Sequence, residues 1–464
     1  MDYSQSPSSG QLPASPGFLL MPSGLGGFEA GGPRIVRARS GREVFLYEGS
    51  VPVGEGERTC SCGRRMHVNG YSELTLRHLP FGESLTSVRL PHAQLRCQGC
   101  SATKMQRIPF RAEGHMVTEP LRQYVRDLLA SGSLTNKEVA EITGLGQNAV
   151  KEIDKERLLE KYAEGGSLTM PESPSEYLAI DEFKLHDGHR YATHIIDLQT
   201  GHVLWIAAGK GKQIVYDFIK RVGDAWMRGV AAVACDMNSD FQEAFQDSCP
   251  WIRVVYDHFH IVKNFNDGVV SAVRKDEQAR LLKSGDARAA RALKRSRFIL
   301  WSSRETLRRA DEAEGRTVRK GAGIFGGPEA KGKGGRVARY EALLKENSLL
   351  MTVEIVRDML SEAYASRDEA EMADMVSRIV GVCHASGNKH FKWFARLLES
   401  HFDGVIAHAT FAISTGMIEG TNQKIKTIRR QAYGIPDDEY FFLKIMDASR
   451  AEYIRNPKSH KILD

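Results

Sequence analysis

Three short apolar runs, separated by turns that contain Gly or Asp-Gly, stand near the middle of the chain at 177–183, 191–198 and 202–208. Tight turns between β-rich runs predict an antiparallel meander. The periodicity then alternates, which predicts further elements in this order: a helix over 213–222, a strand over 230–236, a helix over 239–246, a strand over 252–257 and a helix from 260. Strands that alternate with helices indicate an α/β domain.

Acidic residues close the predicted first and fourth strands, at Asp181 and Asp236. The order of the elements is that of the ribonuclease-H-like fold, in which those two strands lie side by side. Neighbouring strands are about 4.8 Å apart, so carboxylates at matching ends can share a divalent cation. The alternative is that Asp181 and Glu182 simply end a strand in water.

Composition sets the broad class of the protein. A chain of 464 residues, with 42% hydrophobic and 26% charged residues, is ordinary for a globular protein of two to four domains. The formal net charge of +6 does not by itself indicate a nucleic-acid binder. No apolar run reaches the ~18 residues of a membrane span, and the N-terminus does not resemble a signal peptide. We expect a cytoplasmic protein and a disordered Ser-, Pro- and Gly-rich tail over 1–33.

The stretch 34–110 has β-like runs and basic residues, as a surface that contacts DNA requires. It also carries two close pairs of cysteines: Cys60, Cys62, Cys97 and Cys100. Paired thiols in a chain without a secretory signal favour a metal, and four thiolates suit a structural Zn²⁺. The first pair is closer than the usual C-x₂-C spacing, so His67 and His92 remain alternative ligands. A metal-free β domain is the other interpretation.

Residues 111–165 have helical periodicity. A capping pattern, Thr135 ahead of Glu138, begins one helix, and a turn with two glycines separates it from the next. This arrangement predicts a helix-turn-helix, although an ordinary helical hairpin has the same pattern. In a helix-turn-helix three side chains would face the DNA major groove: Gln147, Asn148 and Lys151.

From 279 to 408 the pattern is almost wholly helical, with a break rich in Gly, Lys and Arg at 315–336. Several of these helices are basic, which fits either a solvated surface or phosphate contact. A last dense stretch predicts a helix with Glu419 near its start. Its packed side would hold Met417, Ile418, Ile425 and Ile428. Basic residues crowd its following turns: Lys424, Lys426, Arg429 and Arg430.

Four stretches together resemble the DDE transposases of bacterial insertion sequences, and most nearly the ISL3 group: 181–183, 235–238, 257–260 and 418–434. The resemblance covers about residues 50–450. It implies a triad of Asp181, Asp236 and Glu419, with a helical insertion between the second Asp and the Glu. Asp257 and His260 match a D-x-x-H element, for which a catalytic and a structural role are both open.

The resemblance further implies an enzyme that binds transposon terminal inverted repeats and catalyses Mg²⁺- or Mn²⁺-dependent cleavage and strand transfer. Two ions per site would be held by the triad, with Asp181 bridging both, Asp236 holding one and Glu419 the other. The partners would be double-stranded transposon-end DNA and target DNA, bound by a homodimer or larger assembly. The alternatives are a nuclease of the same fold and a transposase-derived DNA-binding regulator without catalytic activity.

The predicted fold class is therefore α/β, with a ribonuclease-H-like core that carries a large all-helical insertion. A small zinc-binding β module and a helix-turn-helix precede this core. The predicted boundaries are a tail at 1–33, the zinc module at 34–110, the helix-turn-helix at 111–165, the core at 174–278, the insertion at 279–408 and the C-terminal core helices at 409–464.

Overall fold

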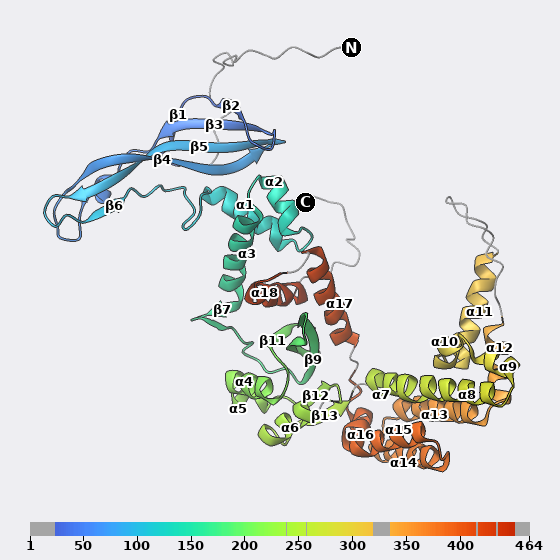
Figure 1. The fold of residues 1–464 in the computed structure, drawn as a ribbon. Coiled ribbons are helices and arrows are strands. Elements are labelled where there is room, and N and C mark those ends of the chain that lie inside the picture. The colour runs from blue at the N-terminus through green and yellow to red at the C-terminus, as the bar shows by residue number, and fades with distance from the viewer. Residues whose placement is uncertain are drawn as a thin grey trace, which may run out of the picture. The chain divides into compact units, whose positions relative to one another are not determined.

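The computed structural model describes residues 24–237, 239–256, 258–318, 335–413, 416–432 and 435–450. The predicted tail up to residue 23, and residues 319–334 of the Gly-, Lys- and Arg-rich break, lie outside the described residues. The chain forms two compact units (Figure 1). The first consists of Met1–Thr169 and Ile425–Asp464, and the second of Met170–Lys424.

The first unit begins with a six-stranded sheet. Its strands are β1 (Glu29–Ala30), β2 (Arg34–Arg37), β3 (Glu43–Ser50), β4 (Met66–Phe81), β5 (Ser84–Cys97) and β6 (Thr103–Met105), with a short 3₁₀ helix, η1 (Glu55–Arg58). The order is β1-β3-β5-β4, while β2 pairs with β3 and β6 with β5. The antiparallel β4–β5 hairpin is much longer than the short runs expected there.

The predicted tail is wrong for residues 24–33. Leu25 and Phe28 are buried in the core of this sheet, and β1 pairs with β3. Two apolar side chains in a Gly-rich segment are enough to bury it, because the neighbouring sheet supplies the rest of the apolar surface.

Three helices follow in the first unit: α1 (Glu119–Ala130), α2 (Asn136–Thr143) and α3 (Gln147–Tyr162). A two-stranded ribbon, β7 (Ala163–Glu164) and β8 (Ser167–Leu168), comes after them. The predicted capping box is confirmed, because Thr135 Oγ1 accepts from the Glu138 N–H and Glu138 accepts from the Thr135 N–H. Gly144 ends α2 with a φ of 69°, a conformation that favours glycine. A short turn at 144–146 therefore separates α2 from α3, in the stretch where the sequence predicts a helix-turn-helix.

The C-terminal helix α18 (Asp438–Ser449) packs on α3 in the first unit. We predicted residues 409–464 as part of the core, so this grouping differs from the expected one. A fully buried carboxylate, Asp154 of α3, holds the contact together. Its Oδ2 accepts from the Tyr440 hydroxyl at 2.7 Å and from Lys444 Nζ at 3.1 Å, and its Oδ1 lies 2.8 Å from Arg157 Nη2.

Replacing Asp154 by Ala is expected to destabilise the α3–α18 contact by about 3–5 kcal/mol, because it leaves buried cations without their partner. Hydrogen exchange of the α18 amides measures this in the full chain, where a single unfolding transition is not expected. Glu439→Ala is the control, because its carboxylate is 65% exposed and pairs with Lys155 at the surface. That change should cost less than about 1 kcal/mol. Equal effects of the two variants would contradict the central role of Asp154.

The second unit contains a five-stranded sheet in the order β11-β10-β9-β12-β13. Its strands are β9 (Tyr177–His186), β10 (Arg190–Asp197), β11 (Val203–Ala208), β12 (Ala232–Cys235) and β13 (Arg253–Tyr256). The first three pair antiparallel and the last two run parallel to β9, so the meander is confirmed. The first and fourth strands lie side by side, as expected. Three helices connect the strands: α4 (Lys212–Val222), α5 (Asp224–Met227) and α6 (Ser239–Ser248).

Helices make up the rest of the second unit. They are α7 (His258–Asn264), the π-helical segment η2 (Phe265–Val270), α8 (Ser271–Lys283), α9 (Ala287–Leu293), α10 (Arg297–Trp301), α11 (Arg304–Val318), α12 (Arg336–Lys345), α13 (Ser348–Ala365), α14 (Glu369–Ala385), α15 (Lys389–Ser400) and α16 (Phe402–Thr410). One apolar core is continuous from the sheet into these helices, through residues such as Ile195, Val233, Phe265 and Phe394. Within the described part of the chain, no helix has the length and apolar character to cross a membrane.

Candidate active site and metal centre

The sheet of the second unit brings Asp181 and Asp236 together. Ile180 of β9 pairs with Cys235, the last residue of β12, so Asp181 is the next residue on β9 and Asp236 directly follows the end of β12. The Glu182 N–H donates to Asp181 Oδ1 at 2.7 Å, and the Met237 N–H donates to Asp236 Oδ1 at 2.6 Å. One detail of the prediction is wrong: Asp181 lies in the middle of β9, because this strand continues along β10 after β12 has ended.

The surroundings of Asp181 shift the pKa of its carboxyl group in both directions. Burial raises its pKa above the usual value, and hydrogen bonds from the Glu182 backbone and Asn422 act in the opposite direction. The neighbouring Asp236 raises the pKa of Asp181 further, because two like charges repel. His260, from the predicted D-x-x-H element, lies with Nδ1 3.9 Å from Asp236 Oδ1. Asp257 lies outside the described residues.

The helix α17 (Gly416–Gln431) carries Glu419 in its first turn. One turn later, Asn422 Nδ2 donates to Asp181 Oδ2 at 2.7 Å. Residues three apart on a helix are neighbours on its surface, so Glu419 is on the side of α17 that meets Asp181. Glu419 itself is exposed, and the described residues do not gather the three carboxylates within 4.8 Å of one another.

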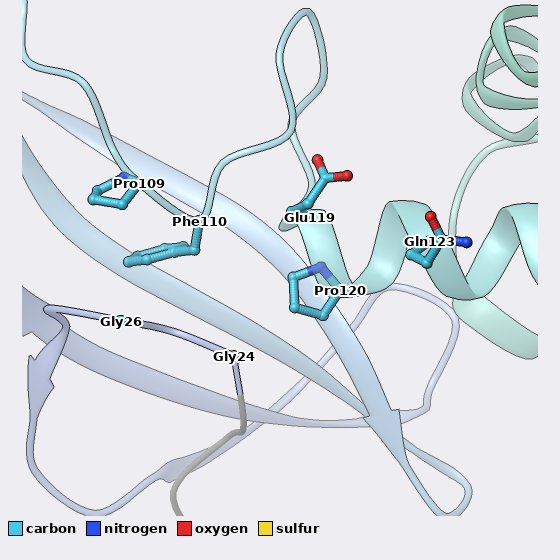
Figure 2. Close-up of a pocket in the computed structure, with 7 residues that line it drawn as sticks. All are labelled: Gly24, Gly26, Pro109, Phe110, Glu119, Pro120 and Gln123. Carbon is cyan, nitrogen blue, oxygen red and sulfur yellow. The ribbon is translucent and has the colours of Figure 1, made fainter. Parts of the chain in front are cut away.

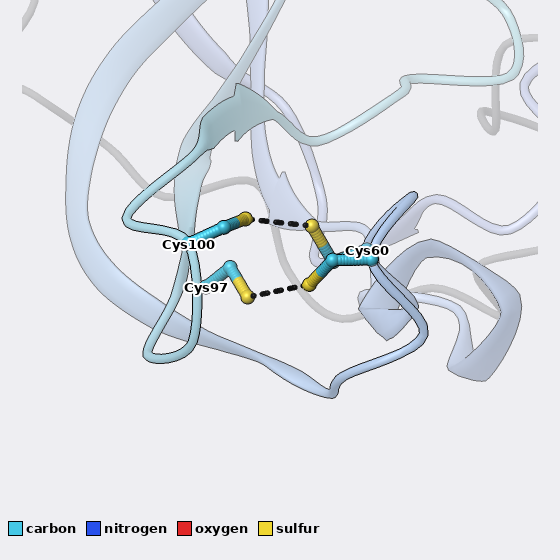
Figure 3. A group of neighbouring side chains, drawn as sticks. Cys60, Cys97 and Cys100 are labelled. Carbon is cyan, nitrogen blue, oxygen red and sulfur yellow. Dashed lines mark hydrogen bonds between the residues drawn. The ribbon is translucent and has the colours of Figure 1, made fainter.

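The four predicted zinc ligands do form a compact cluster. The sulfur atoms of Cys60, Cys62, Cys97 and Cys100 all lie within 4.8 Å of one another. The sulfur atoms of Cys60 and Cys100 are 3.5 Å apart (Figure 3). Those of Cys62 and Cys97 are also 3.5 Å apart. Four thiolates at about 2.3 Å from a tetrahedral Zn²⁺ would be separated by about 3.8 Å, so the spacing fits this ion.

The four thiols influence one another through hydrogen bonds. Hydrogen bonds, first from the Cys62 backbone and then from the Cys100 thiol, lower the pKa of Cys60 to about 6. At Cys62 the Arg64 backbone lowers the pKa, but the Cys97 and Cys100 thiols outweigh this effect and the pKa rises to about 12. His92, an alternative ligand, is engaged elsewhere, because its Nε2 donates to the Gln106 carbonyl at 2.7 Å. The close Cys60–Cys62 spacing is accommodated by a turn in which the Gly63 N–H donates to the Cys60 carbonyl.

Comparison with known proteins supplies the family. A family model for ISL3-type DDE transposases, described as "Transposase", matches residues 178–445. The transposase for insertion sequence element IS1001 of Bordetella parapertussis is 30% identical over 428 residues, which are 91% of this chain and 96% of that protein. The chain belongs to the ISL3 group of DDE transposases. The transposase for insertion sequence element IS1557 of Mycobacterium tuberculosis is 22% identical over 275 residues, 55% of this chain and 56% of that protein.

The remaining predicted residues of this transposase are distributed as follows. Ile418 and Ile425 are buried in α17, as expected. Met417 is 39% exposed, so its predicted place in the packed side is wrong. It lies over the β10–β11 turn instead, where its Cε would be 2.8 Å from a Cβ at Gly201. Among the basic residues of α17, three are exposed: Lys424, Lys426 and Arg430. The fourth, Arg429, lies over the ring of Phe441 at 5.4 Å.

Gln147 and Asn148 are exposed in the first turn of α3, where a helix-turn-helix presents its reading side chains. Lys151 is different, because its Nζ lies 2.7 Å from Asp437 Oδ2 and 3.3 Å from Glu152 Oε1. Its charge is therefore already paired within the first unit of the transposase.

A pocket of about 520 Å³ lies in the first unit (Figure 2). It is lined by Gly24, Gly26, Pro109, Phe110, Glu119, Pro120 and Gln123. Its one acidic side chain, Glu119, accepts from Arg122 at 2.9 Å. Such a lining has no paired acid and base, so we assign no chemistry to it.

Two features of this transposase escaped the sequence analysis: the contact of Asn422 with Asp181, and the acidic residues of α18 and its N-cap that pair with α3. Asn422 was inside a stretch that the family resemblance had singled out. The resemblance assigns a role to Glu419, three residues earlier, but none to Asn422.

Proposed function

We propose that the protein is an active DNA transposase whose catalytic residues are Asp181, Asp236 and Glu419. The observation that carries this proposal is the position of Asp181 and Asp236 at the same level of two adjacent parallel strands. The contact of α17 with Asp181, one turn from Glu419, supports the third member. The sheet order, with the first strand beside the fourth, supports a ribonuclease-H-like core.

The donor set suits hard divalent cations, because Mg²⁺ and Mn²⁺ prefer carboxylate and carbonyl oxygens. A buried oxygen of the same kind, Asn422 Oδ1, has no hydrogen-bond partner among the described residues. Asp181, Asp236 and Glu419 would hold such ions. When bound, they supply Lewis-acid activation of the attacking oxygen and stabilisation of the leaving one.

Backbone groups of the chain hold the two aspartates in place for this reaction. The backbone N–H groups of Glu182 and Met237 each fix one carboxylate oxygen, which leaves lone pairs of both aspartates free to bind. In donor cleavage the attacking group is water, and in joining it is the 3′-hydroxyl just released. Each step breaks one P–O bond and forms another, and the proton lost by the attacking oxygen balances the one gained by the leaving oxygen.

DNA binding is assigned to three parts of the chain. The zinc module offers basic residues, the helix-turn-helix offers the exposed Gln147 and Asn148, and α17 offers its basic run. Both transposon ends must be held during strand transfer, so we propose a homodimer or larger assembly on transposon-end and target DNA. Structural Zn²⁺ in the four-cysteine cluster would fold the β module that contributes to this surface.

Binding to transposon-end DNA is expected to weaken by about 10³–10⁵-fold between 50 and 200 mM salt, as for proteins with six to ten phosphate contacts. Titration of labelled end DNA at several salt concentrations measures the slope. Lys426→Ala should reduce the slope by about one, whereas Lys220→Ala, at an exposed basic residue of α4, should leave it unchanged. A response that is flat with salt would contradict the phosphate contacts.

A further inference from the structure

Asn422 of α17 links this helix, which carries Glu419, to the strand β9, which carries Asp181. Its Nδ2 donates to Asp181 Oδ2 at 2.7 Å, so it joins α17 to β9 directly. It is three residues after Glu419 and shares that face of the helix. The hydrogen bond therefore relates the position of Glu419 to that of Asp181.

The chemistry fixes which way the Asn422 amide points. Only its NH₂ group can face an ionised carboxylate, because Oδ1 is an acceptor and would be repelled. This orientation leaves Oδ1 buried and, among the described residues, without a hydrogen-bond partner. An unsatisfied buried oxygen is costly, so the contact with Asp181 outweighs that cost in setting the orientation.

The same hydrogen bond orients Asp181. Its Oδ1 accepts from the Glu182 N–H and its Oδ2 accepts from Asn422, so both oxygens are fixed in place. Each carboxylate oxygen has two lone pairs, and one on each remains available. A carboxylate held in this way is pre-organised as a ligand without being blocked.

The start of α17 has a second anchor of a different kind. Ile418 is 4% exposed, so its apolar side chain is buried. Apolar burial is not directional, so it holds the helix against the unit but does not define its rotation. A hydrogen bond from one turn further along does define the rotation.

We propose that Asn422 is a positioning residue, which orients the Asp181 carboxylate and fixes the rotation of the first turns of α17, and thereby the place of Glu419. Its catalytic meaning rests on the proposed function of the site. The coupling of α17 to β9 is a separate property, which can be measured without DNA, metal or turnover.

The first experiment is a double-mutant cycle with Asn422→Leu and Asp181→Ala, read by hydrogen exchange of the amides of residues 418–424 in the full chain. Loss of a hydrogen bond to a charged group should speed exchange about tenfold or more in each single variant. The double variant should exchange no faster than the single ones, because both remove the same contact. Gln431→Leu, at an exposed position of the same helix, should leave exchange of these amides unchanged. Additive effects would overturn the proposal.

Asn422→Asp guards against a variant that fails to fold, because it keeps the shape of the side chain and removes the donor. It must also speed exchange, or the proposal is wrong.

The second experiment is titration of the full chain with Mn²⁺ in the absence of DNA. Asn422→Leu should bind about 10–100-fold more weakly if orientation of Asp181 matters to its ligand role, and unchanged binding would refute that role.

These outcomes separate the two proposals. If Asp181→Ala retains strand transfer while the cycle is non-additive, the catalytic assignment fails and the positioning of α17 by Asn422 stands. If the carboxylates are essential while the cycle is additive, the positioning role alone is refuted.

Discussion

Replacing Asp236 by Ala is expected to reduce strand transfer in Mg²⁺ by at least about 1,000-fold, or about 4 kcal/mol in the activation free energy. Asp181→Ala and Glu419→Ala should have effects of the same size, because each removes a carboxylate from one shared metal site. Binding to transposon-end DNA should stay nearly as in the unmodified chain, since none of the three carboxylates is among the assigned DNA contacts. The measurement is a cleavage and joining assay on labelled terminal-repeat DNA, beside a binding titration.

Asp247→Ala is a matched control, because it removes an exposed carboxylate from α6 of the same unit. It should leave both steps intact. Near-normal strand transfer by any of the three triad variants would refute the assignment of that residue. Cleavage by the unmodified chain without joining would indicate a nuclease, and end binding without either step would indicate a regulator.

The purified protein is expected to contain about one zinc ion per chain, and Cys97→Ser should lose it. Structural zinc contributes roughly 10–16 kcal/mol to the folding of small metal-dependent modules. Loss of the ion should therefore unfold the turns around the four cysteines and weaken end binding. Metal analysis and hydrogen exchange over residues 58–105 test this.

Cys249→Ala is the control for that experiment. Its thiol is buried in the second unit, away from any cysteine pair in the sequence, so zinc content should not change. Protein that contains no zinc, with the β module still protected from exchange, would favour the metal-free interpretation of this module.

The elements that follow local rules were predictable from the sequence. Apolar periodicity gave the meander, and Thr135 with Glu138 gave the capped helix, because both depend on residues close along the chain. The adjacency of Asp181 and Asp236 was expected because the order of elements resembles that of the ribonuclease-H-like fold, in which the first and fourth strands are neighbours.

The parts that were missed depend on contacts between distant segments. Nothing near Asn422 in the sequence reveals that it meets Asp181, and nothing near Asp154 reveals that α18 packs on it. The exposure of Met417 is a similar case, because a helical pattern defines an apolar face but not the width of the surface that covers it.

The strand pairing that aligns the two aspartates also determines which changes in chain length the site can tolerate. Loops between β9 and β12 can grow or shrink freely, because the ladder from Tyr177 to Ile180 fixes the alignment. A single deletion inside those four residues would instead turn Asp181 to the opposite side of the sheet, because side chains alternate along a strand. Length variation among natural relatives should therefore collect in the loops and avoid this short ladder.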